Sequence, residues 1–159
     1  MPEKKTMERA KRDRRQGKAP STQAGEFVRE EIDHVREGKH GARSTKQAIA
    51  IGLSKARRAG VELPPPKRGS QATKQQAARD SARSPGAKVS RVRSRATTRA
   101  LKREGSAAAS PQAMARQTRG AAKRRSAADR SAAARQAART KGATKRKAAA
   151  RKSARTRAG

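Results

Sequence analysis

The sequence predicts a mostly disordered chain with a small all-α element: an αα-hairpin at about residues 21–37 and 45–59, followed by a long basic tail with nascent helix. The 159 residues carry 44 Lys and Arg against 12 Asp and Glu, a net charge of +32. Val, Ile, Leu and Phe together number only 12, well below the roughly 20% under which a highly charged chain is expected to be disordered. Nine of these 12 residues precede the proline run at 64–66, so the folded part is expected there.

The proline run also separates two charge regimes. Residues 1–63 hold 16 Lys and Arg against 9 Asp and Glu, and residues 64–159 hold 28 against 3, giving net charges of +7 and +25. We therefore divide the chain into a basic N-terminal arm (1–19), an α-hairpin domain (20–63) and a disordered Ala/Arg/Lys-rich basic tail (64–159).

The first helix of the hairpin is predicted by apolar residues that share one helical face between Pro20 and Gly38: Ala24, Val28, Ile32 and Val35. An acidic stripe lies on the opposite side: Glu26, Glu30, Asp33 and Glu37. Such a stripe is typical of a solvated helix face, and the alternative is a docking strip for a partner or for the protein's own tail. Glu31 falls towards the apolar side, where we expect a local ion pair.

The second helix begins with a capping box, in which Ser44 accepts from a first-turn amide and Gln47 reaches back. Gly60 fits the left-handed residue that follows a helix, with Val61 as its hydrophobic partner. Between these ends runs an apolar seam, flanked by small residues that would let another helix approach closely: Ile49, Leu53 and Ala56, with Ala48, Gly52 and Ala59 beside them. A hairpin of about 40 residues usually needs oligomerisation or a partner to stay folded, so we expect either a homodimer through residues 21–59 or folding on binding.

Several classes of protein and site are excluded by composition. Without Cys there is neither a disulfide framework nor a thiolate zinc site. His34 and His40, the only histidines, are expected to be solvated, because metal sites need three or four converging ligands. With so few apolar residues we expect no enclosed pocket, hence no enzyme, cofactor or small-molecule substrate. The longest apolar run, 48–53, is far too short to span a bilayer, and 1–10 shows no signal peptide, so we expect a cytoplasmic protein without a membrane partner.

The tail has the composition of a polycation that contacts phosphates. Arg125, Arg130, Arg135 and Arg139 point to several sides of a helix, which suits a flexible chain and argues against a coiled-coil seam. Mutual repulsion opposes helix formation in free solution, and phosphate neutralisation would remove it. The residues predicted to bind nucleic acid are Arg116, Arg119, Lys123, Arg124, Arg125, Arg130, Arg135, Arg139, Lys141, Lys145, Arg146, Lys147, Arg151, Lys152, Arg155 and Arg157.

Two resemblances accompany these patterns. The segments Ser21–Glu30 and Ser44–Gly60, with their Lys-Gln-Ala-Ile-Ala-Ile core, resemble an uncharacterised family of small bacterial proteins often labelled DNA-binding or plasmid-stabilisation-like, over roughly residues 20–66. The tail resembles the Ala/Lys/Arg-rich arms of bacterial linker-histone-like proteins. The resemblances imply a DNA-binding role and no established mechanism or site.

The sequence therefore predicts a sequence-nonspecific DNA-binding, histone-like protein of the nucleoid that neutralises and compacts the phosphate backbone. One Phe and no Tyr or Trp weigh against readout of single-stranded bases, which stack on aromatic rings. Duplex DNA is favoured as the partner. The alternatives are an RNA- or ribosome-associated basic protein, or an adaptor whose α-hairpin binds a protein partner.

Overall fold

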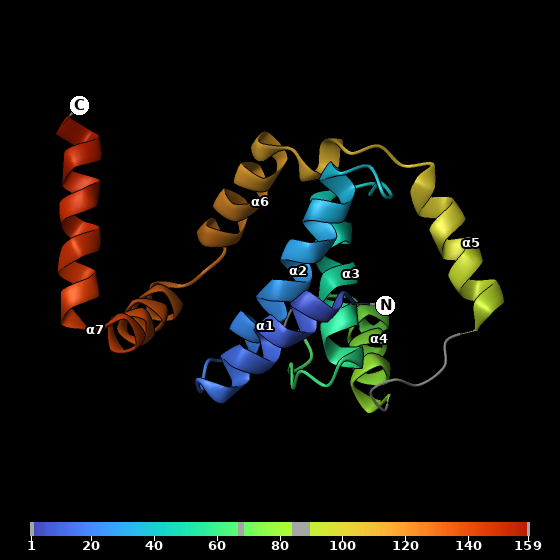
Figure 1. Cartoon of the computed structure of the whole chain (residues 1–159), viewed down its shortest axis with the longest axis horizontal. Coiled ribbons are helices and arrows are strands. Elements are labelled where there is room, and N and C mark those ends of the chain that lie inside the picture. Colours follow the sequence, from blue (N-terminus) through green and yellow to red (C-terminus); the bar gives the residue numbers. More distant parts are fainter. Residues whose placement is uncertain (1, 67–68, 84–89, 159) are drawn as a thin grey trace. The chain divides into compact units, whose positions relative to one another are not determined.

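The computed structural model describes residues 2–66, 69–83 and 90–158, which are helical nearly throughout (Figure 1). The helices are α1 (Lys4–Arg15), α2 (Pro20–Arg36), α3 (Thr45–Arg58), α4 (Gln71–Ala82), α5 (Arg91–Lys102), the 3₁₀ helix η1 (Ala107–Ala109), α6 (Pro111–Lys123) and α7 (Ala127–Ala158). The chain divides into two compact units, Met1–Gln117 and Thr118–Gly159. None of the described helices combines the length and the apolar character needed to cross a membrane.

The prediction of a mostly disordered chain is wrong. The structure is 76% helical, with eight helices and no strand among the described residues. Two physical effects explain the difference. Ala, Arg, Lys and Gln are strong helix formers, and serine side chains cap helices in the basic region: Ser70, Ser90 and Ser126 accept from the amides of Thr73, Arg93 and Asp129.

The hairpin lies where the sequence predicts it, and its helices touch through small side chains. Ala48, Gly52 and Ala56 are buried against α2, and a Cβ atom built on Gly52 would lie 2.7 Å from the Cα of Val28. Ile49 and Leu53, predicted as the centre of the seam, are only half-buried at its margin. The small residues, rather than the large ones, therefore set the close approach of the two helices.

Both predicted helix ends of α3 are found. Ser44 Oγ accepts from the Gln47 amide at 3.2 Å, while Gln47 Oε1 accepts from the amide of Arg43, one residue before the expected one. Gly60 takes φ +87°, its amide donates to the Arg57 carbonyl, and the amide of the buried Val61 donates to the Ala56 carbonyl. This is a Schellman motif, which pairs carbonyls that a helix end otherwise leaves without a partner.

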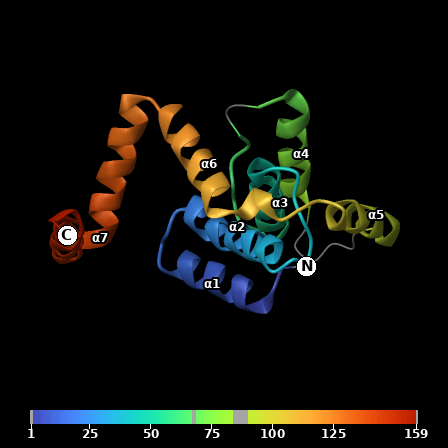
Figure 2. The ribbon, with the colours of Figure 1, turned by 90° about the horizontal axis from the view of Figure 1, so that it is seen from above.

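The core extends beyond the hairpin because other segments of the first unit cover it. Helix α1 lies along α2, and α3 contacts α4 (Figures 1 and 2). Ala10 of α1 joins Ala24, Phe27, Ala56 and Val61 in one apolar cluster. The segment expected to be part of a basic arm is thus a helix with buried residues.

A second apolar cluster includes residues from the Ala-rich segment near 108. Ala108 and Ala109 of η1 pack with residues of the hairpin, including Ile32 and Val35. Two hydrogen bonds hold η1 in place: Thr45 Oγ1 donates to the Ala108 carbonyl at 2.6 Å, and Arg36 Nε donates to the Ala109 carbonyl at 3.0 Å. The hairpin therefore finds apolar cover within its own chain. The homodimer through residues 21–59 stays a prediction, which sedimentation equilibrium tests.

Candidate nucleic-acid interface

Helix α5 carries a stripe of exposed cations. Arg91, Arg95, Arg99 and Lys102 are spaced four, four and three residues apart, which places them on one helix face with one charge about every 6 Å. Within the described part of the chain, none of the four lies within 4.0 Å of a carboxylate oxygen. We name these four residues the α5 stripe. Its charges are available to phosphates.

The second half of α7 carries a similar stripe. Gly142 interrupts this helix with φ 64° and ψ 165°, so α7 is two helical segments in series. After the interruption, Lys147, Arg151 and Arg155 recur at four-residue spacing on one face, and all three are exposed. We name these residues the α7 stripe.

The other predicted binding residues are distributed differently. Arg116, Arg119 and Lys123 are exposed on α6, and Arg124 and Arg125 lie in the connection to α7. In the first half of α7, Arg130, Arg135 and Arg139 are exposed, and Arg130 donates to the Arg125 carbonyl at 2.7 Å. The side chains of Lys141, Lys145, Arg146, Lys152 and Arg157 lie outside the described residues.

Sequence reasoning missed the α5 stripe, although its spacing is visible in the sequence. The signal is the recurrence of cations at helical period between the cap at Ser90 and Arg103, in a segment that was assigned to a disordered tail. When the segment is helical, this spacing places its cations on one face of the helix.

Few carboxylates are left to neutralise these cations. Residues 64–159 contain only Asp80, Glu104 and Asp129. Asp80 is buried, where it accepts from Ser54 Oγ at 2.6 Å and lies 4.0 Å from Arg58. Asp129 and Ser126 cap the N-terminus of α7, since each side chain accepts from the other's backbone amide. Two of the three acidic groups therefore stabilise the fold.

The acidic stripe of α2 is paired with donors from several segments of the first unit. Glu26 pairs with Arg9 of α1 at 3.6 Å. Glu30, which is buried, accepts from the backbone amide of Glu3 at 3.1 Å and from Lys55 Nζ at 3.3 Å. Asp33 lies 3.8 Å from Arg36 and Glu37 2.9 Å from Lys39, so the whole stripe contacts basic or amide donors of the same unit.

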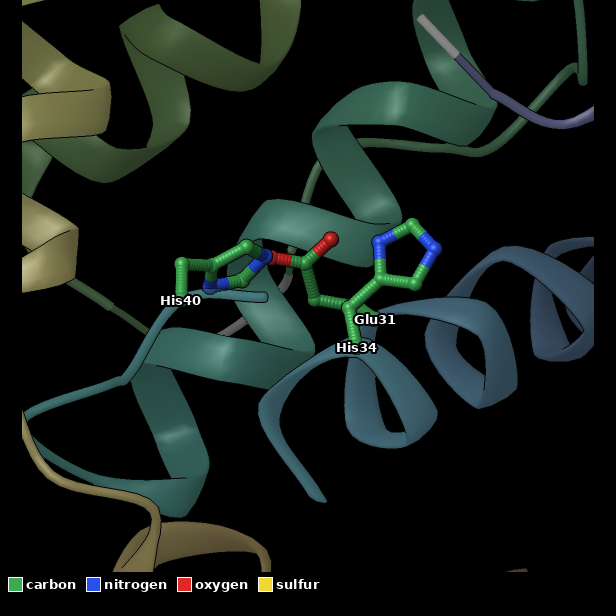
Figure 3. Close-up of side chains that lie close together, drawn as sticks. All are labelled: Glu31, His34 and His40. Carbon is green, nitrogen blue, oxygen red and sulfur yellow. The ribbon is translucent and has the colours of Figure 1, made fainter. Parts of the chain in front are cut away.

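A group of charged and histidine side chains surrounds Glu31 (Figure 3). The Glu31 carboxylate is buried, with Lys55 Nζ 2.6 Å from Oε2 and His40 Nε2 3.3 Å from Oε1. The expected ion pair therefore exists, with a partner on α3 instead of a local one. The prediction that both histidines are solvated is wrong, because the side chains of His34 and His40 are only 14% and 15% exposed.

Glu3 connects this group to α1 through two hydrogen bonds. Its Oε1 lies 2.9 Å from His34 Nε2 and 3.4 Å from Lys39 Nζ. The hydrogen bonds from His34 and Lys39 hold the pKa of the Glu3 carboxyl below its ordinary value. The hydrogen bond to Glu37 raises the pKa of the Lys39 ammonium.

Comparison with known proteins adds one finding. Residues 3–68 match a family of unknown function (DUF6496). No curated protein and no solved structure matches the chain. The match covers α1, α2 and α3 and ends before α4, so any role for the cationic helices rests on their own chemistry.

Proposed function

We propose that this protein binds duplex DNA without sequence specificity, as a histone-like protein of the nucleoid that neutralises and compacts the phosphate backbone. The observation that carries the proposal is the pair of exposed cationic stripes on α5 and α7. An α-helix is about as wide as the major groove, so such a stripe can reach backbone phosphates from the groove or across its edge.

The aromatic content favours backbone contacts over base contacts. Phe27 is the only aromatic residue apart from the histidines, and it is 1% exposed in the core. No ring of Phe, Tyr or Trp is therefore available to stack on unpaired bases, which single-strand binding modules require. Phosphate contacts position a protein on a duplex and carry no sequence information by themselves.

Charge-removal variants test the proposal. Each lysine or arginine that neutralises a phosphate contributes about −0.9 to the slope of log K against log salt. Two triple variants each remove one stripe. The first carries Arg91→Gln, Arg95→Gln and Arg99→Gln, and the second carries Lys147→Gln, Arg151→Gln and Arg155→Gln. Each triple variant should make the slope of log K against log salt less negative by about 2.7. Fluorescence anisotropy of a labelled duplex, titrated at several salt concentrations, measures it.

A matched control removes the same charge from the first helix of the chain. Lys5, Lys11 and Arg12 are exposed on α1 and lie in no salt bridge among the described contacts. Their joint replacement by Gln should change the slope by less than about one. An equal loss in the control and the stripe variants would mean that binding follows net charge alone, and the proposal of a directed interface would be abandoned.

A further inference from the structure

We propose that Glu31, His34 and His40 form a binding site for a divalent transition metal, best suited to Zn²⁺, that fastens the α2–α3 connection to α2. One ligand atom from each residue lies within 4.8 Å of the other two. Two histidines and one glutamate are a ligand set that zinc takes in proteins, with water in the fourth position.

The hydrogen bonds of the outer ring nitrogens determine which nitrogens face the site. His34 Nε2 contacts the Glu3 carboxylate at 2.9 Å, and His40 Nδ1 contacts the Gly41 carbonyl at 3.1 Å. Carboxylate and carbonyl oxygens only accept, so both of these nitrogens carry the proton and donate. A neutral imidazole then has its lone pair on the other nitrogen, Nδ1 of His34 and Nε2 of His40. Figure 3 shows one nitrogen of each ring facing the Glu31 carboxylate.

This arrangement is the one that metal-bound histidines usually have. A ligating histidine donates its second N–H to a carboxylate or a backbone carbonyl, which fixes the ring and its tautomer. Glu3 and Gly41 supply one acceptor of each kind. With both rings neutral, the two lone pairs and the Glu31 carboxylate face one another, and a bound cation would stabilise this arrangement.

The distance between His40 and Glu31 fits a tetrahedral ion. His40 Nε2 lies 3.3 Å from Glu31 Oε1. Two ligand atoms bound to zinc at about 2.0–2.1 Å with a tetrahedral angle are separated by about 3.3 Å. Lys55 Nζ pairs with the other oxygen, Oε2, at 2.6 Å, and among the described residues neither oxygen of Glu31 has a partner in hydrogen-bond geometry. Oε1 therefore remains available as a single metal ligand while Lys55 holds Oε2.

A metal bound at this site would cross-link, and so stabilise, a small core. His40 belongs to the connection between α2 and α3, whose next residues, Gly41 and Ala42, donate to the carbonyls of Leu101 and Gly105. Glu3 precedes α1. A metal held by Glu31, His34 and His40 would therefore tie the α2–α3 connection to α2, with Glu3 hydrogen-bonded behind His34, and metal binding of this kind contributes directly to folding stability.

Zinc titration of the full-length, tag-free chain tests this inference, and the chain suits the assay because it has two histidines and no cysteine. After treatment with a chelator, isothermal titration with Zn²⁺ should saturate at one equivalent, and both histidine rings should shift together in NMR spectra. Co²⁺ in place of Zn²⁺ should give the strong visible absorption of a tetrahedral site. Multiple weak equivalents, or histidine resonances that do not move in the wild-type protein, would overturn the inference without recourse to any variant.

Variants distinguish the residues that bind zinc from neighbouring residues that do not. His34→Asn with His40→Asn should weaken zinc binding by more than about 100-fold, and Glu3→Ala, which removes an acceptor behind a ligand, by about tenfold. Glu8→Gln, which changes an exposed carboxylate of α1 outside the ligand set, is the matched control and should bind like wild type. Circular dichroism without metal checks that each variant is folded. Unchanged affinity in the folded double-histidine variant would contradict the assignment.

Discussion

Replacing Gly52 by Ala should destabilise the first unit, although the same change stabilises most helices. Ala is favoured over Gly in a helix interior by about 1 kcal/mol. At position 52, however, the new Cβ would lie 2.7 Å from Val28 Cα and 3.0 Å from both Phe27 O and Val28 N. These are backbone atoms of α2, so no side chain can rotate away.

The magnitude follows from the separation that the helices must adopt. Carbon atoms in contact prefer about 3.5–4.0 Å, so α3 must move from α2 by close to 1 Å locally, which forfeits a quarter to a half of the dispersion energy of nearby contacts. Overpacking of this kind costs about 1–3 kcal/mol. After the gain of about 1 kcal/mol in helix propensity, we expect the free energy of unfolding to fall by as much as about 2 kcal/mol.

Urea denaturation, monitored by NMR, measures this change in the free energy of unfolding. The ring signals of Phe27, the only Phe in a chain without Tyr or Trp, report the α2–α3 core without overlap from other rings of that kind. Gly25→Ala on α2 is the matched control, because a Cβ there meets nothing within 4 Å, and it should raise stability by about 0.5–1 kcal/mol. If Gly52→Ala were as stable as Gly25→Ala, the close helix approach described here would be refuted.

Three further substitutions have expected outcomes. Lys55→Met leaves the buried Glu30 and Glu31 without their shared cation and should lower the free energy of unfolding by about 3–5 kcal/mol. Lys46→Met, at an exposed position of the same helix, should change it by less than about 0.5 kcal/mol, and urea unfolding compares the two variants. Ser44→Ala removes the acceptor for the Gln47 amide and should cost about 1 kcal/mol, measured as a shift of the urea midpoint at unchanged slope. Gly60→Ala places a residue with a Cβ at a backbone φ of +87° and should lower the melting temperature. Gly120→Ala within α6 is the control and should not lower it. Equal melting temperatures would argue against the Schellman motif.

The hairpin could be predicted from the sequence because its signals are local. Ser44 and Gly60 each act on amides and carbonyls within four residues, so the sequence alone contains the information. The apolar period of Ala24, Val28, Ile32 and Val35 is equally local. Small residues at 48, 52 and 59 indicated a close approach, and the structure buries the first two of them against α2.

The remaining core could not be predicted because its contacts join distant segments through residues with weak patterns. Ala108 and Ala109 sit in a run of Ala and Ser that matches the rest of the tail, yet they are held by Thr45 and Arg36, 63 and 73 residues away. The burial of α1 had a faint signal, since Thr6, Ala10 and Asp13 share a helix face, but two of them are polar. Counting large apolar residues also undervalues a core built mainly from Ala.

The candidate sites also differ in how far the sequence predicts them. The α5 and α7 stripes follow from helical spacing once the segments are known to be helices. The meeting of His40 with Glu31 depends on how the connection between α2 and α3 folds back, which residue spacing does not encode.

The measurement that tests the central claim most directly is binding of the full-length protein to a duplex DNA and to a structured RNA, each titrated across salt by fluorescence anisotropy. If about ten phosphates are neutralised on DNA, log K should fall with log salt at a slope near −9, with DNA bound at least as tightly as RNA. A preference for RNA that persists at high salt would contradict the DNA-binding account and favour a ribosome-associated protein. Weak binding to both would remove nucleic acid as the partner and leave the hairpin as the functional element.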